Sequence, residues 1–439
     1  MRNVLMLTFF WPPKYQSGIW RPMKFAKYMP QHGWKPTVLT AKFPLDKDAP
    51  CVREDNIPPC EVIRVEPNSD RTLARAMSWA VWPMAKLLGK NRQWVEDALE
   101  WRMAWSLQWP DRGTSCNRWM IPMLSNAMDL LAGDRFDAVY VTAPPVQLTL
   151  VAAVLAMLRP KPIIMDLRDP WTQEFQYTQR GFRRGVDEWV EKSCLRRCDR
   201  IVTVTPMQTA DLSRLYPELT GKLRCITNGF DPEDILPRNV RVPDGRLIVT
   251  YCGMSYEKLD QVTQAVRLAC QRREAFREQF EMRWIGPQPR HPSAEEVAPI
   301  KYLGILPKND AMRITQETDV LWFEVPINGH SRYIYPGKMF EYMVMDRPII
   351  GTIPEGACME KLLHPMGYCR FCYSRDPEKM AALLDQVFDD WQAGKLAGGA
   401  SAEARAEHVR RFRRDVLTGQ LCDVLNEVTR GSRRRHDCP

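Results

Sequence analysis

Short apolar runs alternate with segments of helical periodicity along nearly the whole chain. In the N-terminal half the apolar runs are typical of buried strands and lie at residues 4–7, 37–40, 62–65, 138–142, 162–165, 200–204 and 223–227. Helices are expected between them, notably at 19–31, after the proline pair at 144–145, and at 183–197. Uninterrupted apolar strands separated by helices indicate a parallel sheet covered on both faces, so this half predicts a doubly wound α/β domain.

A second series of the same kind follows a proline-rich, charged linker at residues 231–245. Its expected strands are 247–251, 282–285, 301–303, 320–325 and 348–353, with helices notably at 258–272 and 338–345. We therefore expect two tandem Rossmann-like domains, at 1–235 and 246–400, with a cleft between the carboxyl ends of their strands. A last helix is expected at about 402–428, within a segment bounded as 401–430, followed by a disordered tail at 431–439.

One region breaks the alternation. Residues 71–119 are rich in tryptophan, methionine and basic side chains, with Trp79, Trp82, Trp94, Trp101, Trp105, Trp109 and Trp119. On a helix, Trp94, Trp101 and Trp105 would fall near one face with basic neighbours, which suits an element lying at a membrane surface. A helical cap over the first sheet is the alternative interpretation.

Charge narrows the classes of partner. The 439 residues carry a net charge of +9 with a pI near 8.9, which fits nucleic acid, an anionic membrane face or a phosphorylated small molecule. No compact basic array interleaved with aromatic residues indicates a nucleic-acid module, so no nucleic-acid partner is expected.

The cysteines favour a reducing compartment, and we expect a cytoplasmic protein. Their number, 13, is odd, and most lie in apolar strings. Cys369 and Cys372 form one C-x-x-C without a second pair or a nearby histidine, which argues against zinc. No leader is expected, and no membrane span either, because Pro144 and Pro145 interrupt the long uncharged stretch 138–158.

The first loop, F-W-P-P-K-Y-Q-S-G-I-W-R-P, joins a strand to a helix. Gly18 would let the backbone approach a ligand, and the helix N-terminus beside it offers free N–H groups to an anion. Ser17 shares this position, and Arg21 adds a cation one turn into the helix. A plain helix start is the alternative, and the absence of G-x-G-x-x-G argues against an NAD site.

The segment Asp166–Trp171, D-L-R-D-P-W, follows another expected strand end. Asp166 and Asp169 could orient hydroxyl groups or shuttle a proton, and Arg168 could hold a phosphate or an aspartate. These three side chains are the candidate catalytic residues, with Asp169 favoured for contact with the acceptor or the reacting sugar. The alternative is a structural ion pair that shapes the loop.

The segment Y-P-G-K-M-F-E-Y-M opens a helix after a strand. Gly337 lies at the helix start, where free N–H groups and the positive helix end favour a diphosphate that Lys338 would also attract. Glu341 lies one turn further, where a carboxylate can accept hydrogen bonds from two ribose hydroxyls. The alternatives are a solvated lysine and an ordinary helix carboxylate.

Three further strand ends of the second domain are donor-site candidates. Gly253 allows close backbone approach after the first strand, and Lys258 can reach a phosphate. Gly286, in W-I-G-P, and Leu306, in L-G-I-L-P, stand where backbone groups could contact a base. The sequence does not distinguish uracil from guanine.

Taken together, these segments resemble a GT-B glycosyltransferase of family 4, of the type found in bacterial polysaccharide assembly. The resemblance covers nearly the whole chain and lies in F-A-K-Y-M-P-Q-H-G-W, T-A-P-P, D-L-R-D-P-W, C-D-R-I-V-T-V-T, I-T-N-G-F-D-P and P-G-K-M-F-E-Y-M-V-M-D-R-P-I-I. Many family members carry two glutamates eight positions apart; Glu341 matches the second, and Tyr333 replaces the first. The family's histidine before an aspartate in the first domain is also missing, with D-L-R-D in that region.

The resemblance implies that the first domain binds the acceptor and the second a nucleoside diphosphate sugar. It also implies that no metal or other cofactor is required and that the last helix crosses back to the first domain. The expected function is a hexosyltransferase-type glycosyltransferase, with a retaining outcome, acting on a polysaccharide or lipid-linked acceptor. A nucleotide-sugar 2-epimerase and a non-catalytic GT-B scaffold at a membrane are the alternatives, and peripheral contact with the inner face of the cell membrane is a further expectation.

Overall fold

The computed structural model describes residues 1–13, 17–43, 57–67, 86, 117–173, 177, 180–236, 244–253, 260–287, 299–396 and 401–436. The chain divides into two compact units. The first unit comprises Met1–Ile226 together with Thr418–Pro439, and the second comprises Thr227–Leu417. Within the described ranges, every helix is too short or too polar to cross a bilayer.

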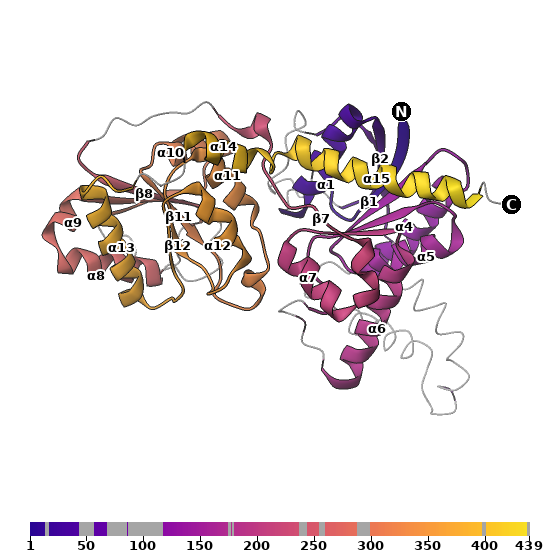
Figure 1. The fold of residues 1–439 in the computed structure, drawn as a ribbon, viewed down its shortest axis with the longest axis horizontal. Helices are drawn as coiled ribbons and strands as arrows, with labels where there is room; N and C mark the ends of the chain where they lie inside the picture. Colours follow the sequence, from indigo (N-terminus) through magenta and orange to yellow (C-terminus); the bar gives the residue numbers. More distant parts are fainter. Residues whose placement is uncertain are drawn as a thin grey trace. The chain divides into compact units, whose positions relative to one another are not determined.

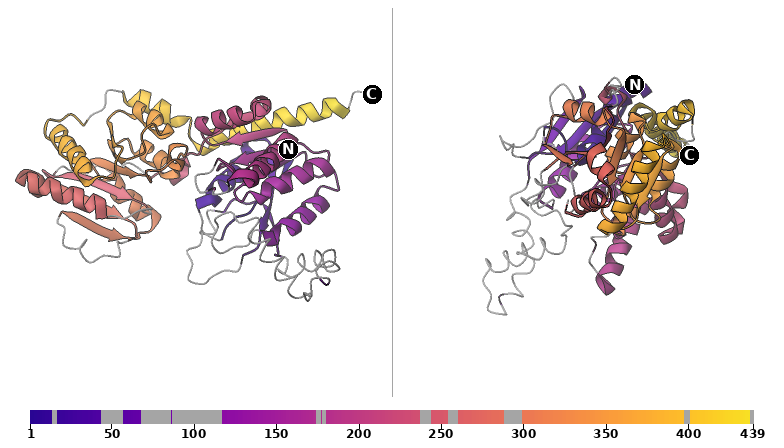
Figure 2. Two further views of the ribbon diagram at one scale, coloured as in Figure 1. Left: turned by 90° about the horizontal axis from the view of Figure 1, so that it is seen from below. Right: turned by 90° about the vertical axis from the view of Figure 1, so that its left-hand side faces the viewer.

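The first unit is built on a seven-stranded parallel sheet of order β3-β2-β1-β4-β5-β6-β7. The strands are β1 (Arg2–Thr8), β2 (Trp34–Ala41), β3 (Glu61–Val65), β4 (Ala138–Ala143), β5 (Ile163–Leu167), β6 (Arg200–Thr203) and β7 (Leu223–Cys225). The helices are η1 (Ser17–Ile19), α1 (Trp20–Tyr28), η2 (Met29–His32), α4 (Asn117–Leu130), α5 (Gln147–Leu158), α6 (Gly181–Arg197), α7 (Pro206–Leu215) and η4 (Pro217–Lys222). They lie on both faces of the sheet (Figures 1 and 2).

The second unit repeats this plan on a six-stranded parallel sheet of order β10-β9-β8-β11-β12-β13. The strands are β8 (Leu247–Cys252), β9 (Phe280–Ile285), β10 (Ile300–Gly304), β11 (Val320–Glu324), β12 (Ile349–Thr352) and β13 (Cys369–Cys372). The helices are η5 (Pro232–Asp234), α8 (Asp260–Arg272), α9 (Glu274–Gln279), α10 (Lys308–Gln316), η7 (His330–Arg332), α11 (Gly337–Met345), α12 (Cys358–Leu363), η8 (His364–Met366), α13 (Pro377–Gln392) and α14 (Ala402–Arg410). The prediction of two tandem doubly wound domains is thus confirmed.

Each sheet has one point where the strand order reverses, and this position matters for function. In the first unit it lies between β1 and β4, where Val4 is paired with Pro36 on one side and Ala138 on the other. In the second unit it lies between β8 and β11. Doubly wound sheets bind ligands at the carboxyl ends of the strands beside this reversal, so the loops after these four strands are the candidate positions for a ligand.

The last helical segment differs from the single helix predicted at 402–428. It is broken into α14 and α15 (Arg414–His436). The break has a tertiary cause: the Phe230 N–H donates to the Phe412 carbonyl at 3.1 Å, and the Arg414 N–H donates to the Phe230 carbonyl at 2.8 Å. A Cβ on Gly229 would collide with the same Phe412 carbonyl, which explains the glycine of the I-T-N-G-F-D-P segment.

These contacts also move two predicted boundaries. Residues 227–235 belong to the second unit rather than to the end of the first, because Phe230 pairs with the segment before α15. The predicted tail at 431–439 begins inside α15, which continues to His436.

The residues of α15 from Thr418 onward belong to the first unit. Nη1 of Arg2 and Nε1 of Trp34 both donate to Oδ1 of Asn426, at 2.8 and 3.2 Å. Glu427 is paired with Arg200 at 2.5 Å and with Arg224 at 3.2 Å. Polar contacts therefore fasten this helix to the strands β1, β2, β6 and β7.

Strand β13 coincides with the C-x-x-C segment, which the sequence analysis did not identify as a strand. Cys369 and Cys372 are both buried, and burial raises the pKa of Cys369 to about 12. Their thiols lie against different carbonyls, those of Leu363 at 3.3 Å and Ser374 at 3.1 Å. Residues three apart on a strand point to opposite faces, so the two sulfurs do not form one ligand pair.

Most of the tryptophan-rich segment 71–119 lies outside the described residues, and its membrane and cap interpretations stay predictions. Its end is described. Trp119, on α4, is buried, and its Nε1 donates to the Val65 carbonyl at 3.2 Å. Its ring contacts those of Phe9 and Phe43, with centroids 5.5 and 5.3 Å away. This tryptophan belongs to the core of the first unit.

Candidate functional site

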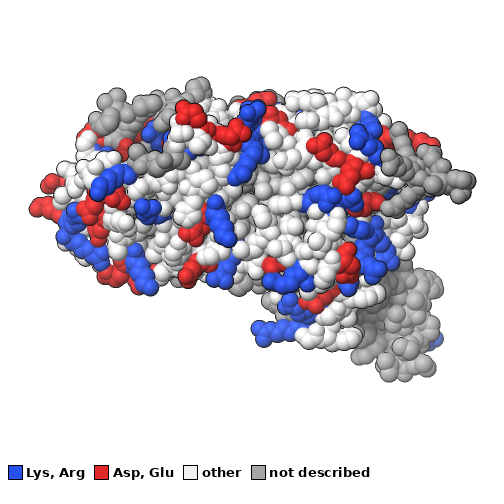
Figure 3. Space-filling model, in the orientation of Figure 1, with Lys and Arg blue, Asp and Glu red and all other residues white. Residues whose placement is uncertain are grey.

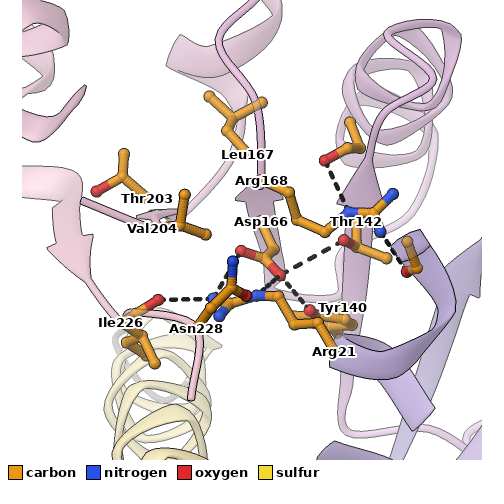
Figure 4. A network of polar contacts seen from close by, with 12 residues as sticks. Arg21, Tyr140, Thr142, Asp166, Leu167, Arg168, Thr203, Val204, Ile226 and Asn228 are labelled. Atoms are coloured by element: carbon orange, nitrogen blue, oxygen red, sulfur yellow. Dashed lines mark hydrogen bonds and ion pairs between the residues drawn. The ribbon is translucent and has the colours of Figure 1, made fainter. Parts of the chain in front are cut away.

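A buried ion pair lies at the end of β5 in the first unit. The Arg21 side chain reaches from α1 to Asp166, with Nε–Oδ2 at 2.8 Å and Nη2–Oδ1 at 3.1 Å. The Tyr140 hydroxyl donates to Oδ2, and the Thr142 hydroxyl lies 3.4 Å from the same oxygen (Figure 4). Arg21 and Asp166 are only 2% and 0% exposed, so the protein itself supplies the donors around this carboxylate.

This geometry changes how two candidate residues are interpreted. The guanidinium of Arg21, expected to be available to an anion, is instead directed at Asp166 and at the Ile226 carbonyl, 2.8 Å from Nη2. Burial alone would lower the pKa of Arg21, but the charge of Asp166 and its hydrogen bond to the guanidinium, with smaller effects of Tyr140 and Cys225, together outweigh burial and raise it. For Asp166, these contacts favour the structural ion pair over the catalytic role.

Arg168 joins two loops of the first unit. Its Nη2 donates to the Pro144 carbonyl at 2.8 Å, its Nε to the Ala143 carbonyl at 3.3 Å, and its Nη1 to the Gly18 carbonyl. A Cβ on Gly18 would lie 2.6 Å from Nη1, so a side chain there would displace the guanidinium. Arg168 thus ties together the loops after β1 and β4, the two strands at the reversal, and Gly18 has a packing role in this contact.

Asp169 is half-buried and lies in the loop after β5. A second buried carboxylate, that of Glu191, accepts hydrogen bonds from this loop. Oε2 of Glu191, on α6, accepts hydrogen bonds from the Thr172 hydroxyl at 2.6 Å, the Tyr216 hydroxyl at 2.9 Å and Nε2 of Gln173 at 3.0 Å. Burial raises the pKa of Glu191. The sequence analysis missed Glu191, because a single glutamate within a charged helix gives no signal of burial. Asp169 stays the candidate of this loop for contact with a substrate.

In the second unit, the Lys338 ammonium lies at the end of β8. Lys338 is half-buried, and its Nζ lies 5.5 Å from the centroid of the Tyr251 ring. A Cβ on Gly253 would collide with Nζ, so the glycine makes room for the ammonium. Burial lowers the pKa of Lys338. A half-buried cation beside a strand at the reversal, in the first turn of a helix, is suited to bind an anion.

Helix α11 is anchored to the sheet through its second turn and is open at its first residue. The Cys252 N–H donates to the Tyr342 hydroxyl at 3.1 Å, which fixes the buried Tyr342 ring of α11 against the end of β8. Gly337 is exposed, and a Cβ there would meet no atom within 4 Å. Because the first N–H groups of a helix have no partner within it, this end can donate hydrogen bonds to a ligand.

Glu341 lies one turn into α11 and is half-buried. Burial raises its pKa, while the charges of Lys308 and Lys338 oppose the rise. Lys308 itself is paired with Asp234, with Nζ–Oδ2 at 2.8 Å. Within the described part of the chain, the Glu341 carboxylate makes no hydrogen bond or ion pair. The oxygens of such a half-buried carboxylate can accept hydrogen bonds from the hydroxyl groups of a ligand.

Backbone contacts link the ends of β8, β9 and β10. The Gly253 N–H donates to the Ile285 carbonyl at 2.8 Å, and the Gly286 N–H donates to the Gly304 carbonyl at 2.9 Å. Leu306 follows β10 and is half-buried. Of the predicted donor residues, Gly253, Gly286, Leu306, Gly337, Lys338 and Glu341 come from this sheet edge and α11. Gly18, which was also predicted to bind the donor, lies in the first unit, and Lys258 lies outside the described residues.

Replacing Gly286 by alanine is expected to destabilise the second unit by about 1–3 kcal/mol. Its φ is +150°, and a Cβ would collide with the Gly253 carbonyl oxygen. Urea unfolding of the full chain measures the effect. Gly337→Ala is the matched control, because its Cβ enters open space. Equal stability of the two variants would contradict the close approach of the two strand ends.

The described residues on the face drawn in Figure 3 form no single basic patch. On the face drawn in Figure 3, basic and acidic side chains of the described residues lie interspersed. Among the described residues, no group of three or more His, Cys, Asp or Glu side chains could hold a metal ion.

Comparison with known proteins yields one family match. Residues 104–234 match the model of Glycosyltransferase Family 4. This segment contains Asp166, Arg168 and Asp169. No curated protein sequence matches the chain.

Solved structures share the fold over nearly the whole chain at low sequence identity. Sucrose-phosphate synthase from Thermosynechococcus elongatus is 12% identical with a TM-score of 0.64, over 98% of this chain and 100% of that one. HepE from Anabaena, solved in complex with UDP-glucose, is 13% identical with a TM-score of 0.60, over 97% and 100%. A UDP-forming α,α-trehalose-phosphate synthase from Burkholderia vietnamiensis is 15% identical with a TM-score of 0.60, over 98% and 100%. These matches confirm the resemblance drawn from the motifs: the chain has the GT-B fold and carries, over residues 104–234, the sequence signature of Glycosyltransferase Family 4.

Proposed function

We propose that the protein is a glycosyltransferase whose second unit binds a nucleoside diphosphate sugar at the edge formed by β8, β9 and α11. The observation that carries the proposal is the half-buried Lys338 ammonium, which lies beside Gly253 in the first turn of α11. The family match supports the reaction class, and the UDP-glucose complex of HepE supports the class of donor.

The chemistry follows from charge. When the bond between the sugar and the diphosphate breaks, negative charge grows on the leaving diphosphate. Lys338 and the N–H groups at the start of α11 are fixed donors that stabilise this charge. Glu341 accepts hydrogen bonds from the ribose hydroxyls, and the backbone at Gly286 and Leu306 contacts the base. No metal is needed in this scheme, so donor turnover should persist in EDTA.

We extend the proposal to the transfer of a hexose to a polysaccharide or lipid-linked acceptor, with retention of the anomeric configuration. The acceptor is assigned to the first unit, where Asp169 contacts it or the reacting sugar. The family match over residues 104–234, which includes Asp169, supports this assignment. Arg168 and the Arg21–Asp166 pair hold the loop in place.

A thermal-shift screen with nucleotides and nucleotide sugars tests the proposal, because a ligand that binds only the folded state raises its stability. UDP and UDP-glucose are the first probes, followed by guanosine analogues. Stabilisation followed by release of the nucleoside diphosphate in the presence of acceptor supports the transferase. Conversion of the donor without acceptor would indicate an epimerase, and the absence of any stabilisation would indicate a non-catalytic scaffold.

As the pH rises, donor affinity should begin to fall at a pH below the range in which lysine side chains usually lose their proton. Burial lowers the pKa of free Lys338, whereas a bound diphosphate favours the charged ammonium and raises it. Since binding raises the pKa, the affinity is full below the lowered pKa of the free protein and declines as the pH rises through it. Calorimetry with UDP across the alkaline range checks this. Lys338→Gln should remove this component of the pH dependence, and an unchanged profile would disprove the assignment.

A further inference from the structure

The N-terminal half of α6 presents three large apolar side chains to solvent. Phe182, Val186 and Trp189 are spaced by four and three residues, so they lie on one face of the helix, here called the α6 stripe. They are 90%, 36% and 67% exposed. Together with Gly185 they line a shallow hollow of about 350 Å³.

The stripe lies on a projecting part of the first unit. In Figure 1, one end of α6 extends below the other described helices and strands of this unit. It is the N-terminal end, because residues 181–186 are all exposed, whereas Cys194 and Leu195 near the other end are buried. Contiguous exposed apolar side chains indicate an interaction surface, since they add nothing to the packing of the domain.

Around the α6 stripe, the basic side chains are more exposed to solvent than the acidic side chains. Arg183 pairs with Asp187 at 3.0 Å, and Arg184 pairs with Glu188 at 2.8 Å. The two arginine side chains are 43% and 48% exposed, but the two carboxylates only 12% and 29%. Arg180, just before the helix, is also exposed. A partner approaching the stripe therefore meets more positive than negative charge.

We propose that the α6 stripe docks on an anionic lipid surface. Phe182 and Trp189 enter the interfacial region of the bilayer, where aromatic side chains are favoured, and the exposed arginines contact lipid phosphates. A second copy of the chain is the competing partner. Two stripes facing each other would bring the outward arginines of both copies together, and this repulsion favours the membrane. The proposal does not depend on the donor site of the second unit.

Flotation of the full chain with phosphatidylcholine vesicles, with and without phosphatidylglycerol, tests the proposal. The unmodified chain should bind the vesicles that contain phosphatidylglycerol. The Phe182→Ser/Trp189→Ser variant should bind about tenfold more weakly or worse, and Arg180→Gln about fivefold more weakly. Met157→Ser is the matched control, because Met157 on α5 is 65% exposed outside the stripe, and its binding should not change.

Two results would overturn the proposal: no binding of the unmodified chain to anionic vesicles, or equal binding by the Phe182→Ser/Trp189→Ser variant. A concentration-dependent dimer that this variant abolishes, without vesicle binding, would assign the stripe to a second copy and reject the membrane. UDP-induced thermal stabilisation is measured in every variant. Equal melting temperatures without ligand show that the fold is intact, and equal UDP-induced shifts keep this test separate from that of the donor site.

Discussion

Replacing Asp166 by asparagine is expected to destabilise the first unit by about 3–5 kcal/mol. The substitution keeps the shape but leaves the buried Arg21 guanidinium without the carboxylate that both Nε and Nη2 contact. Arg21 cannot discharge by losing its proton, since a guanidinium stays charged in proteins. Urea unfolding gives the overall change, and hydrogen exchange of the β5 amides locates it in the first unit.

Two controls separate this buried pair from ordinary charge removal. Asp134→Asn breaks the pair with Lys161, in which the aspartate is fully exposed, and should cost no more than about 1 kcal/mol. The double variant Arg21→Met/Asp166→Leu removes both charges and should recover much of the loss. If Asp166→Asn costs no more than Asp134→Asn, the pair does not hold the loop as described.

Replacing Lys338 by alanine is expected to lower donor turnover by about 10²–10³-fold while leaving stability unchanged or slightly raised. The loss of turnover and the unchanged or raised stability have different causes. The ammonium stabilises the leaving diphosphate, but burial lowers its pKa and so disfavours the charged form in the folded protein. A residue that served only the fold would show the reverse pattern. Steady-state turnover and urea unfolding of the same preparation measure both quantities.

The companion variant Glu341→Ala distinguishes the two parts of the donor. Glu341 is assigned to the ribose, so its loss should weaken UDP binding and leave inorganic diphosphate binding unchanged. Lys338→Ala should weaken both. Lys301→Ala is the matched control, because this exposed lysine of the same unit pairs with Glu281 and should affect neither ligand. Undiminished turnover in both the Lys338 and Glu341 variants would eliminate the donor-site assignment.

Much of the fold could be predicted because parallel strands buried on both faces are continuous apolar runs. The run at residues 4–7 corresponds to the fully buried centre of β1, and the run at 247–251 to β8. Strand β13 was not predicted, because its sequence Cys-Arg-Phe-Cys is short and contains a charged residue. The break before α15 could not be predicted, since it depends on the pairing of Phe412 with Phe230, which is distant in sequence.

In the candidate sites too, features set by local sequence could be predicted, whereas contacts between residues distant in sequence could not. Local sequence predicted the start of α11, because a proline and a glycine before an apolar helix mark a free helix end. The partner of Asp166 could not be predicted, because Arg21 is 145 positions away and only the fold brings them together. A neighbouring arginine in D-L-R-D-P-W suggested a local pair, but Arg168 binds backbone carbonyls instead.

Hydrogen exchange of the full chain with and without saturating UDP tests the central claim most directly. Slower exchange should be concentrated in the first turn of α11 and at the strand ends around Gly253 and Gly286. Protection confined to the first unit, or no protection at all, would contradict the assignment of the nucleotide to this edge of the second sheet.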